Sequence, residues 1–205
     1  MNLEKIAIYV LPIFLLLLFL HLTAFDASFY RQEALKLYTY KQIQEVNISS
    51  ELLINHLKGE IDLADYFTEK ENIHLDDVKK LLKINKLIII ALGIIISSAS
   101  LSLIIKKRFI SLCGYITNSS LISIAFYLIL IIIIISWFEI SFVKFHEILF
   151  TNDFWLLDQN SLLITLFPQR FFEDAAIRII KNSVITSVVI ALFMIILKLS
   201  NKNFK

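Results

Sequence analysis

Four long apolar runs divide this chain of 205 residues, and they constrain its fold more than any other feature of the sequence. Each run is about 20 residues long, which is the length an α-helix needs to cross the hydrocarbon core of a bilayer. Only three glycines and two prolines are present, so long uninterrupted helices are favoured over turn-rich β structures. Hydrophobic residues make up 58% of the chain, against roughly 45–50% in soluble domains. We therefore predict an all-α polytopic membrane protein with four transmembrane helices.

Charges beside the apolar runs predict the topology. The predicted spans are about residues 6–25, 87–105, 117–138 and 176–197. By the positive-inside rule, the cluster Lys106-Lys107-Arg108 and the basic tail indicate that both termini and the short connection between the second and third spans lie in the cytoplasm. We expect the first run to stay uncleaved, because Asp26 stands where a signal cleavage site needs a small residue. Segments 26–86 and 138–175 are then extracytoplasmic.

Segment 26–86 holds most of the acidic residues, and we expect it to form a small, mainly helical domain. Residues 28–46 have helical spacing, with short extended pieces around 38–48 as an alternative. A break is predicted at 47–50, with a helix N-cap near Ser49 or Ser50 and a C-cap at Gly59. The next helix is expected to begin at Asn72 and to run into the second span, with Asp76 and Asp77 in its first turn.

Residues 145–172, FHEILFTNDFWLLDQNSLLITLFPQRFF, are too apolar for a solvated loop and too polar for a membrane span. This profile favours a lid that lies at the membrane surface. Its aromatic residues are also typical of an interfacial belt. Asn152, Asp153 and Asp158 are expected to cap turns.

Several functional classes have no support in the sequence. It contains no basic tract, phosphate-binding loop or RNA-binding signature, so we expect no nucleic-acid partner. Cys113 is the single cysteine, which excludes an intrachain disulfide and a cysteine-based metal cluster. We predict no cofactor and no metal.

The chain has four histidines, and the predicted topology puts all of them on the extracytoplasmic side. His21 and His56 are interpreted as structural, whereas His74 and His146 are candidates for an acid–base pair because a histidine has a pKa near 6.5. A structural role is the alternative for both, at a helix start for His74 and in packing for His146. A zinc site from His74-x-x-Asp77 with His146-Glu147 is a further alternative, although no H-E-x-x-H spacing supports it. No G-x-S-x-G elbow suggests a serine hydrolase.

Two motifs resemble those of the lipoprotein intramolecular transacylases, the Lit family of Gram-positive bacteria. The first is Glu71-Asn72-Ile73-His74-Leu75-Asp76-Asp77-Val78-Lys79. The second comprises Phe145-His146, Leu149-Phe150, Asn152-Asp153, Trp155, Leu157-Asp158, Leu163-Ile164, Phe167-Pro168 and Phe171-Phe172. Length and number of spans agree as well, so the resemblance covers nearly the whole chain. Gln159 and Gln169 depart from the family pattern, where a proline and a glutamate are expected.

The resemblance implies a reaction without a soluble substrate. Members of the family move the sn-2 acyl chain of a diacylglyceryl-cysteine lipoprotein onto the α-amino group of the same cysteine, giving a lyso-form lipoprotein. The family's functional histidines correspond to His74 and His146, and the partners are lipoproteins and membrane phospholipid. Candidate substrate-binding residues are Asn152, Asp153, Trp155, Asp158, Phe167, Phe172 and Arg178.

Two alternatives remain beside this interpretation. One is a non-enzymatic membrane protein whose ectodomain binds a partner, and the other is a metal-dependent membrane lipid hydrolase. The acid–base hypothesis requires that the rings of His74 and His146 lie within about 10 Å of each other, because both must reach the same substrate.

Overall fold

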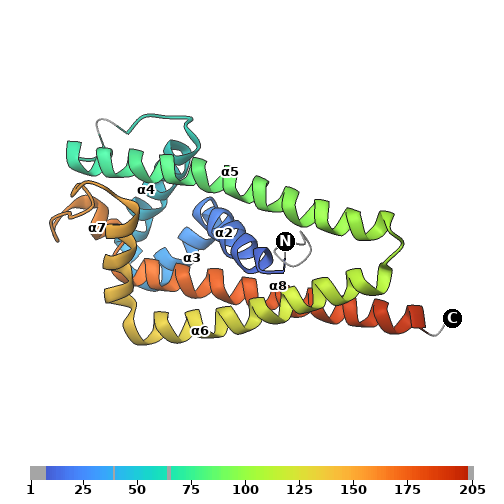
Figure 1. The fold of residues 1–205 in the computed structure, drawn as a ribbon. Coiled ribbons are helices and arrows are strands. Elements are labelled where there is room, and N and C mark those ends of the chain that lie inside the picture. The colour runs from blue at the N-terminus through green and yellow to red at the C-terminus, as the bar shows by residue number, and fades with distance from the viewer. Residues whose placement is uncertain (1–7, 39, 64–65, 203–205) are drawn as a thin grey trace. The chain divides into compact units, whose positions relative to one another are not determined.

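The computed structural model describes residues 8–38, 40–63 and 66–202, and the regular elements in this part of the chain are all helices (Figure 1). Their bounds are α2 Val10–Ala24, α3 Ala27–Leu37, α4 Tyr40–Lys58, α5 Glu69–Ile105, α6 Phe109–Leu149, α7 Leu162–Leu166 and α8 Gln169–Lys202. The prediction of an all-α protein is confirmed.

Among the residues that the structure describes, three helices are long and apolar enough to cross a membrane: Glu69–Ile105, Phe109–Leu149 and Gln169–Asn201. A fourth span is present if α2 and α3, which meet at 69°, are counted as one bent element. The last three predicted spans fall inside α5, α6 and α8, and α2 covers residues 10–24 of the first. Residues 6 and 7 of the first predicted span lie outside the described residues.

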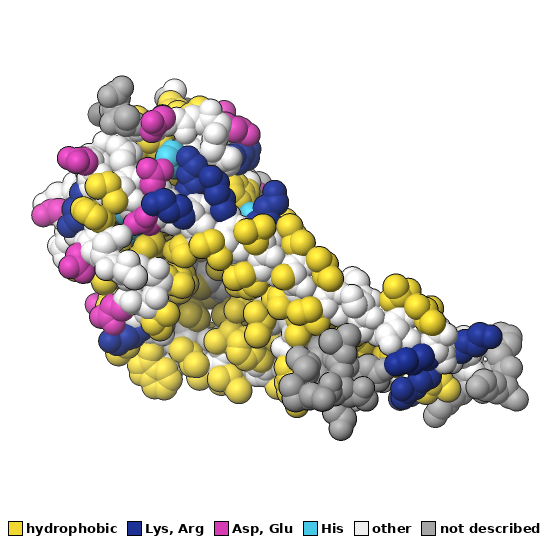
Figure 2. All heavy atoms as spheres, turned by 45° about the horizontal axis from the view of Figure 1, so that its top comes forward, with side chains coloured by type: hydrophobic (Ala, Val, Ile, Leu, Met, Phe, Trp, Pro, Cys, Tyr) yellow, Lys and Arg dark blue, Asp and Glu magenta, His cyan; other side chains and the backbone are white. Residues whose placement is uncertain are grey.

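The described residues form two compact units, and the long helices α5, α6 and α8 contribute to both. We call residues 8–20, 86–133 and 177–202 the apolar unit, and the described residues of 21–85 and 134–176 the histidine unit. All four histidines, and every Asp and Glu of the described chain, lie in the histidine unit. In Figure 2 the acidic side chains accordingly gather on that unit, and much of the visible surface of the apolar unit is hydrophobic.

The core of the apolar unit joins the ends of three helices. Its buried members are Ala99, Leu103, Leu112, Cys113, Tyr115 and Met194. Tyr127 of α6 is fully buried, and its hydroxyl donates a hydrogen bond to the Pro12 carbonyl of α2 at 2.6 Å. Ser120 and Ser123 donate to carbonyls four residues earlier. These bonds satisfy the hydroxyls within the helix, so α6 continues through this polar stretch.

The predicted helix break at 47–50 is wrong, because α4 runs unbroken through these residues and the interruption falls after α3. The Ser49 hydroxyl donates to the Glu45 carbonyl at 2.7 Å, and the Ser50 hydroxyl donates to the Val46 carbonyl at 2.6 Å. Both serines therefore bond back into the helix instead of capping a new one. The predicted C-cap is present, since Gly59 has a φ of +86° directly after α4.

The start of α5 also differs from the prediction. The helix begins at Glu69, so Asp76 and Asp77 lie beyond its first turn. Thr68 and Glu71 form a capping box: the Glu71 carboxylate accepts from the Thr68 backbone N–H at 2.8 Å, and the Glu71 N–H donates to the Thr68 hydroxyl at 3.4 Å. The predicted continuation of this helix into the second span is confirmed.

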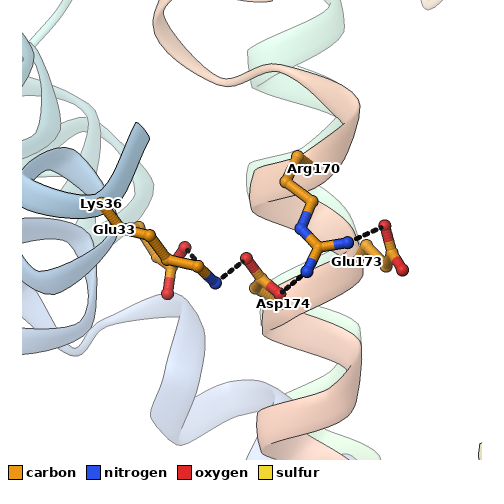
Figure 3. A network of polar contacts seen from close by, with 5 residues as sticks. All are labelled: Glu33, Lys36, Arg170, Glu173 and Asp174. Atoms are coloured by element: carbon orange, nitrogen blue, oxygen red, sulfur yellow. Dashed lines mark hydrogen bonds and ion pairs between the residues drawn. The ribbon is translucent and has the colours of Figure 1, made fainter. Parts of the chain in front are cut away.

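A charged network holds α3 against the start of α8 within the histidine unit (Figure 3). Lys36 pairs with Asp174, and it also lies 3.6 Å from the buried Glu33. Arg170 pairs with Glu173 at 3.0 Å and with Asp174 at 3.3 Å. The two acidic residues of α8 thus have partners on α3 and on their own helix.

The positive φ of Gly59 yields a test of the α4 C-cap. A Cβ at this position would meet only the Lys79 Cε, at 3.7 Å, so the cost of Gly59→Ala comes from the backbone conformation. We expect a loss of about 1–2 kcal/mol, measured as a lower thermal midpoint in detergent. Gly114→Ala is the matched control, because that helical position has nothing within 4 Å and should tolerate a methyl group. Equal losses in both variants would contradict the assignment.

Candidate active site

His74 of α5 and His146 of α6 lie face to face within the histidine unit. Their ring centroids are 6.0 Å apart, with an angle of 33° between the ring planes. This separation meets the 10 Å condition stated above. The sequence places the two residues 72 positions apart, so the pair exists only because α5 and α6 extend beyond their apolar stretches and bring these turns together.

Aromatic rings surround the pair and make its environment apolar. Phe150 contacts both histidines, with centroid distances of 5.1 Å to His74 and 5.6 Å to His146. Phe142 lies 4.4 Å from the His146 ring, and Trp155 lies 5.1 Å from it. Such an environment disfavours a charged imidazole, because burial in apolar surroundings removes its hydration.

The His146 ring is held in one tautomer by its own helix. Its Nδ1 lies 2.7 Å from the Phe142 carbonyl oxygen, one turn earlier on α6. A carbonyl only accepts hydrogen bonds, so Nδ1 carries the proton and Nε2 of the neutral ring has a free lone pair. Burial lowers the pKa of His146, and the bond to Phe142 opposes that shift only in part. At neutral pH this histidine is therefore a base ready to accept a proton at Nε2.

His74 differs from its partner because no hydrogen bond joins its ring to another described residue. It lies outside the predicted membrane span. Burial lowers the pKa of His74 to about 4, the nearby His146 adds to the shift, and Asp77 opposes it. The neutral ring carries one N–H and one lone pair, so His74 can donate a hydrogen bond to a substrate oxygen without being protonated.

Asp77 connects this site to the segment after α6. Asn152 donates a hydrogen bond to Asp77 at 2.9 Å, and Lys80 pairs with the other carboxylate oxygen at 2.9 Å. The hydrogen bond from Asn152, followed by that from Lys80, lowers the pKa of Asp77. Asp77 is therefore a fixed negative charge one turn after His74.

The remaining candidate residues have different surroundings. Trp155 contacts His146, and Asn152 donates a hydrogen bond to Asp77. The Asp158 side chain caps a turn by accepting from the Asn160 N–H at 2.9 Å, and the exposed Asp153 accepts through its carbonyl from Leu156. Phe172 packs on Phe142 at 5.4 Å, whereas Phe167 packs on Tyr30 at 5.9 Å. Arg178 belongs to the part of α8 in the apolar unit.

The donors of the alternative metal site do not gather into one set. Glu147 pairs with Lys144 at 2.6 Å, and Asp77 is engaged by Asn152 and Lys80. In the described part of the chain, no group of three or more His, Cys, Asp or Glu side chains is arranged to hold a metal ion.

Glu71, which belongs to the first of the two family motifs, has a structural role that was not predicted from the sequence. The Glu71 carboxylate is fully buried and accepts a hydrogen bond from the Leu163 N–H, 92 residues away, at 2.7 Å. The spacing Thr68-x-x-Glu71 is a capping-box signature and would have placed the helix start correctly. No local pattern indicates the contact with Leu163.

Fold and site together define a class: a helical membrane protein whose polar unit holds a pair of neutral histidines among aromatic rings. A model of the family "Lipoprotein intramolecular transacylase Lit" matches residues 5–172, well over half of the chain. The chain belongs to this family, and it is therefore an acyltransferase that acts in lipoprotein processing. A search of curated proteins gave no match.

Solved structures support the fold independently. The membrane-integral lipoprotein intramolecular transacylase Lit from Bacillus cereus is 23% identical, with a TM-score of 0.83 over 99% of this chain and 97% of that chain. Two variants of that protein, in which a histidine is replaced by arginine or by alanine, have TM-scores of 0.80 and 0.73. Their identities to this chain are 23% and 22%, with coverage of 99% and 98% of this chain and 93% and 96% of theirs.

The depressed pKa of His74 predicts a pH-dependent stability. The ring titrates near 6.5 when unfolded and at about 4 when folded, so the unfolded state binds more protons between these values. The stabilisation is complete above pH 6.5 and is lost as the pH falls towards 4, by about 3 kcal/mol for this shift.

We expect the thermal midpoint in detergent to fall more steeply between pH 7 and pH 4.5 for the wild type than for His74→Phe. Phenylalanine keeps the aromatic contact with Phe150 and removes the titration. Identical pH slopes for the two proteins would show that His74 titrates normally in the folded state.

Proposed function

We propose that this chain transfers the sn-2 acyl chain of a diacylglyceryl-cysteine lipoprotein to the α-amino group of the same cysteine, by acid–base catalysis at His146 and His74. The observation that carries the proposal is the pair of facing rings, 6.0 Å apart, in which His146 presents Nε2 as a base. The product is an N-acylated, monoacylglyceryl lipoprotein of the lyso form.

His146 is the general base in this proposal. The neutral form of the α-amine, whose pKa is near 8, attacks the ester carbonyl, and its nitrogen must lose one proton as the amide forms. Nε2 of His146 takes that proton, because Nδ1 is already committed to Phe142. The imidazolium then keeps its Nδ1–H bond to the Phe142 carbonyl, which partly offsets the cost of a charge among aromatic rings.

In this proposal His74 stabilises the developing oxyanion. Attack of the amine converts the ester carbonyl into a tetrahedral intermediate whose oxygen becomes negative, and a hydrogen-bond donor positioned there lowers the barrier. The neutral His74 ring supplies this donor through its N–H, and its depressed pKa keeps it neutral at physiological pH. When the intermediate collapses, the imidazolium of His146 returns its proton to the departing glycerol oxygen.

The substrate itself contributes to the rate. The amine and the ester belong to one molecule, so binding that molecule in a bent conformation places the reacting atoms together, and such arrangements are worth several orders of magnitude in rate. Trp155 contacts His146 and Asn152 bonds to Asp77, and these two residues are our first candidates for contacts with the lipid-modified cysteine. Arg178 is a candidate for a contact with a lipid headgroup.

The proposed topology keeps the spans and sides predicted from the sequence. Both termini are cytoplasmic, and the histidine unit is the extracytoplasmic domain and lid. The restriction of the described acidic residues to the histidine unit supports this arrangement, since that unit then faces water and headgroups while the apolar unit faces lipid. Diacylglyceryl lipoproteins would reach the site laterally from the surrounding phospholipid.

Mass spectrometry of an N-terminal lipopeptide tests the reaction and both histidines. With wild-type protein and a diacylglyceryl lipopeptide we expect the N-acyl, monoacylglyceryl product. His74→Ala and His146→Asn should each slow its formation by about 10²–10⁴-fold, the usual contribution of a positioned proton-transfer group. The asparagine variant keeps a donor close to the Phe142 carbonyl and removes only Nε2.

His56→Asn is the matched control for this experiment. His56 is another buried histidine of the same unit, and it contacts the Ile61 carbonyl and Asp76 instead of the facing rings. We expect this variant to keep wild-type rates. Unchanged product formation in the His146→Asn variant would exclude His146 as the base, and absence of product with folded wild type would refute the proposed reaction.

A further inference from the structure

Glu71 is a buried charged group that the proposed acid–base chemistry does not use. It lies one helical turn before His74 and is 0% exposed. One carboxylate oxygen accepts from the Thr68 N–H at 2.8 Å and the Thr68 hydroxyl at 2.7 Å, and the other accepts from the Leu163 N–H at 2.7 Å. A buried carboxylate is costly unless donors saturate it, so this arrangement indicates a specific task.

The donors also keep Glu71 ionised. Burial alone would raise the pKa of this carboxyl, but the hydrogen bonds from Leu163 and Thr68 outweigh burial and lower it. Both oxygens of an ionised carboxylate are acceptors, and each faces at least one N–H or hydroxyl donor here. A glutamine amide in the same place has only one acceptor oxygen, so it could accept hydrogen bonds from Thr68 or from Leu163 but not from both.

Glu71 fastens a segment that we call the strap, residues 150–161 between α6 and α7. Three hydrogen bonds tie the strap and the first turn of α7 to the start of α5. Asn152 donates to Asp77 at 2.9 Å, Lys70 donates to the Leu156 carbonyl at 2.5 Å, and Leu163 donates to Glu71. The tie through Glu71 is the fully buried one of the three.

The strap supplies two of the rings that cover the histidines. Phe150 contacts both His74 and His146, and Trp155, five residues further along the strap, contacts His146. Phe150 stays bonded to α6 through its N–H and the His146 carbonyl, but a strap released from α5 would take the Trp155 ring away and expose His146 further to water. A base that assists the attack of an amine can also assist the attack of water, so the covering affects which nucleophile reacts.

We propose that Glu71 is a positioning residue that sets the choice of acyl acceptor, because it holds the strap over the histidines and so directs the acyl chain to the amine instead of to water. The proposal rests on the transacylase function proposed above. It assigns Glu71 a role through Leu163 and the strap, without contact with the substrate.

The two outcomes differ in their bonds. In transfer, the amine nitrogen forms the new bond to the acyl carbon, the bond to the glycerol oxygen breaks, and the amine proton ends on that oxygen. In hydrolysis, water forms the new carbon–oxygen bond, and one of its protons passes to the glycerol oxygen. Hydrolysis releases a free fatty acid and leaves a monoacylglyceryl cysteine with a free amine.

The test measures the fraction of acyl groups released as fatty acid, with purified full-length protein, a diacylglyceryl lipopeptide and ¹⁸O-labelled water. We expect Glu71→Gln to raise this fraction about tenfold over wild type, because the amide leaves one buried donor unpaired and shifts the strap towards its open state. The label should appear in the fatty acid. A purely structural role would lower total turnover and leave the fraction unchanged.

Glu33→Gln is the matched control, since Glu33 is also a buried glutamate of the histidine unit and pairs with Lys36 of α3 instead of the strap. Its fatty-acid fraction should equal that of wild type, and an equal rise in both variants would overturn the proposal.

If Glu71→Gln does not yield folded protein, Lys70→Met and Asn152→Ala cut the other two ties and should raise the fraction in the same direction. An unchanged fraction in both overturns the proposal. Failure of the wild type to form any N-acyl product is a different result, because it refutes the transacylase reaction itself.

Discussion

The site depends on helical hydrogen bonding that continues past the apolar stretches of α5 and α6. His74 lies 13 residues before Leu87, where the second predicted span begins, which is about 20 Å along a helix. A break between the apolar run and the histidine would have left the ring on an unsupported loop. Because α5 is unbroken from Glu69 to Ile105, His74 is held on a rigid turn. α6 differs, because its backbone leaves the helical region at Trp137 (φ −143°, ψ 40°), and His146 lies on the helical turns that follow this kink.

The features set by local or solvent constraints could be predicted from the sequence. Apolar runs of this length become helices, since a backbone in lipid must satisfy its hydrogen bonds internally. Gly59 was identified because few other residues accept its positive φ. The helix break predicted at Ser49 and Ser50 is absent, because a serine that caps a helix and a serine that bonds back to a carbonyl look alike in sequence.

The candidate site was less accessible from the sequence. The resemblance to the Lit family singled out His74 and His146, but the tautomer of His146 follows from the direction in which its ring points at Phe142. Glu71 and Leu163 are 92 positions apart, and no periodicity links them. Contacts of this kind depend on how α5 and α7 pack, which the composition of either segment leaves open.

The aromatic covering imposes a balance on the proposed chemistry. Burial lowers the pKa of both histidines and so makes each a weaker base than a solvated imidazole. The same burial disfavours the charged form of the incoming amine, so donor and acceptor shift in the same direction and the proton transfer stays nearly matched. An apolar site therefore loses little base strength relative to its nucleophile, while it gains protection from water.

The aromatic covering that gives this protection is held in place by polar groups. The rings of Phe150 and Trp155 pack on the histidines through non-directional apolar contacts. Hydrogen bonds from Asn152 and Leu163 to carboxylates of α5 are directional, and they fix the position of the strap. Apolar packing alone would allow several arrangements of similar free energy. A buried, saturated carboxylate such as Glu71 penalises every arrangement in which a donor is lost, and so selects one of them.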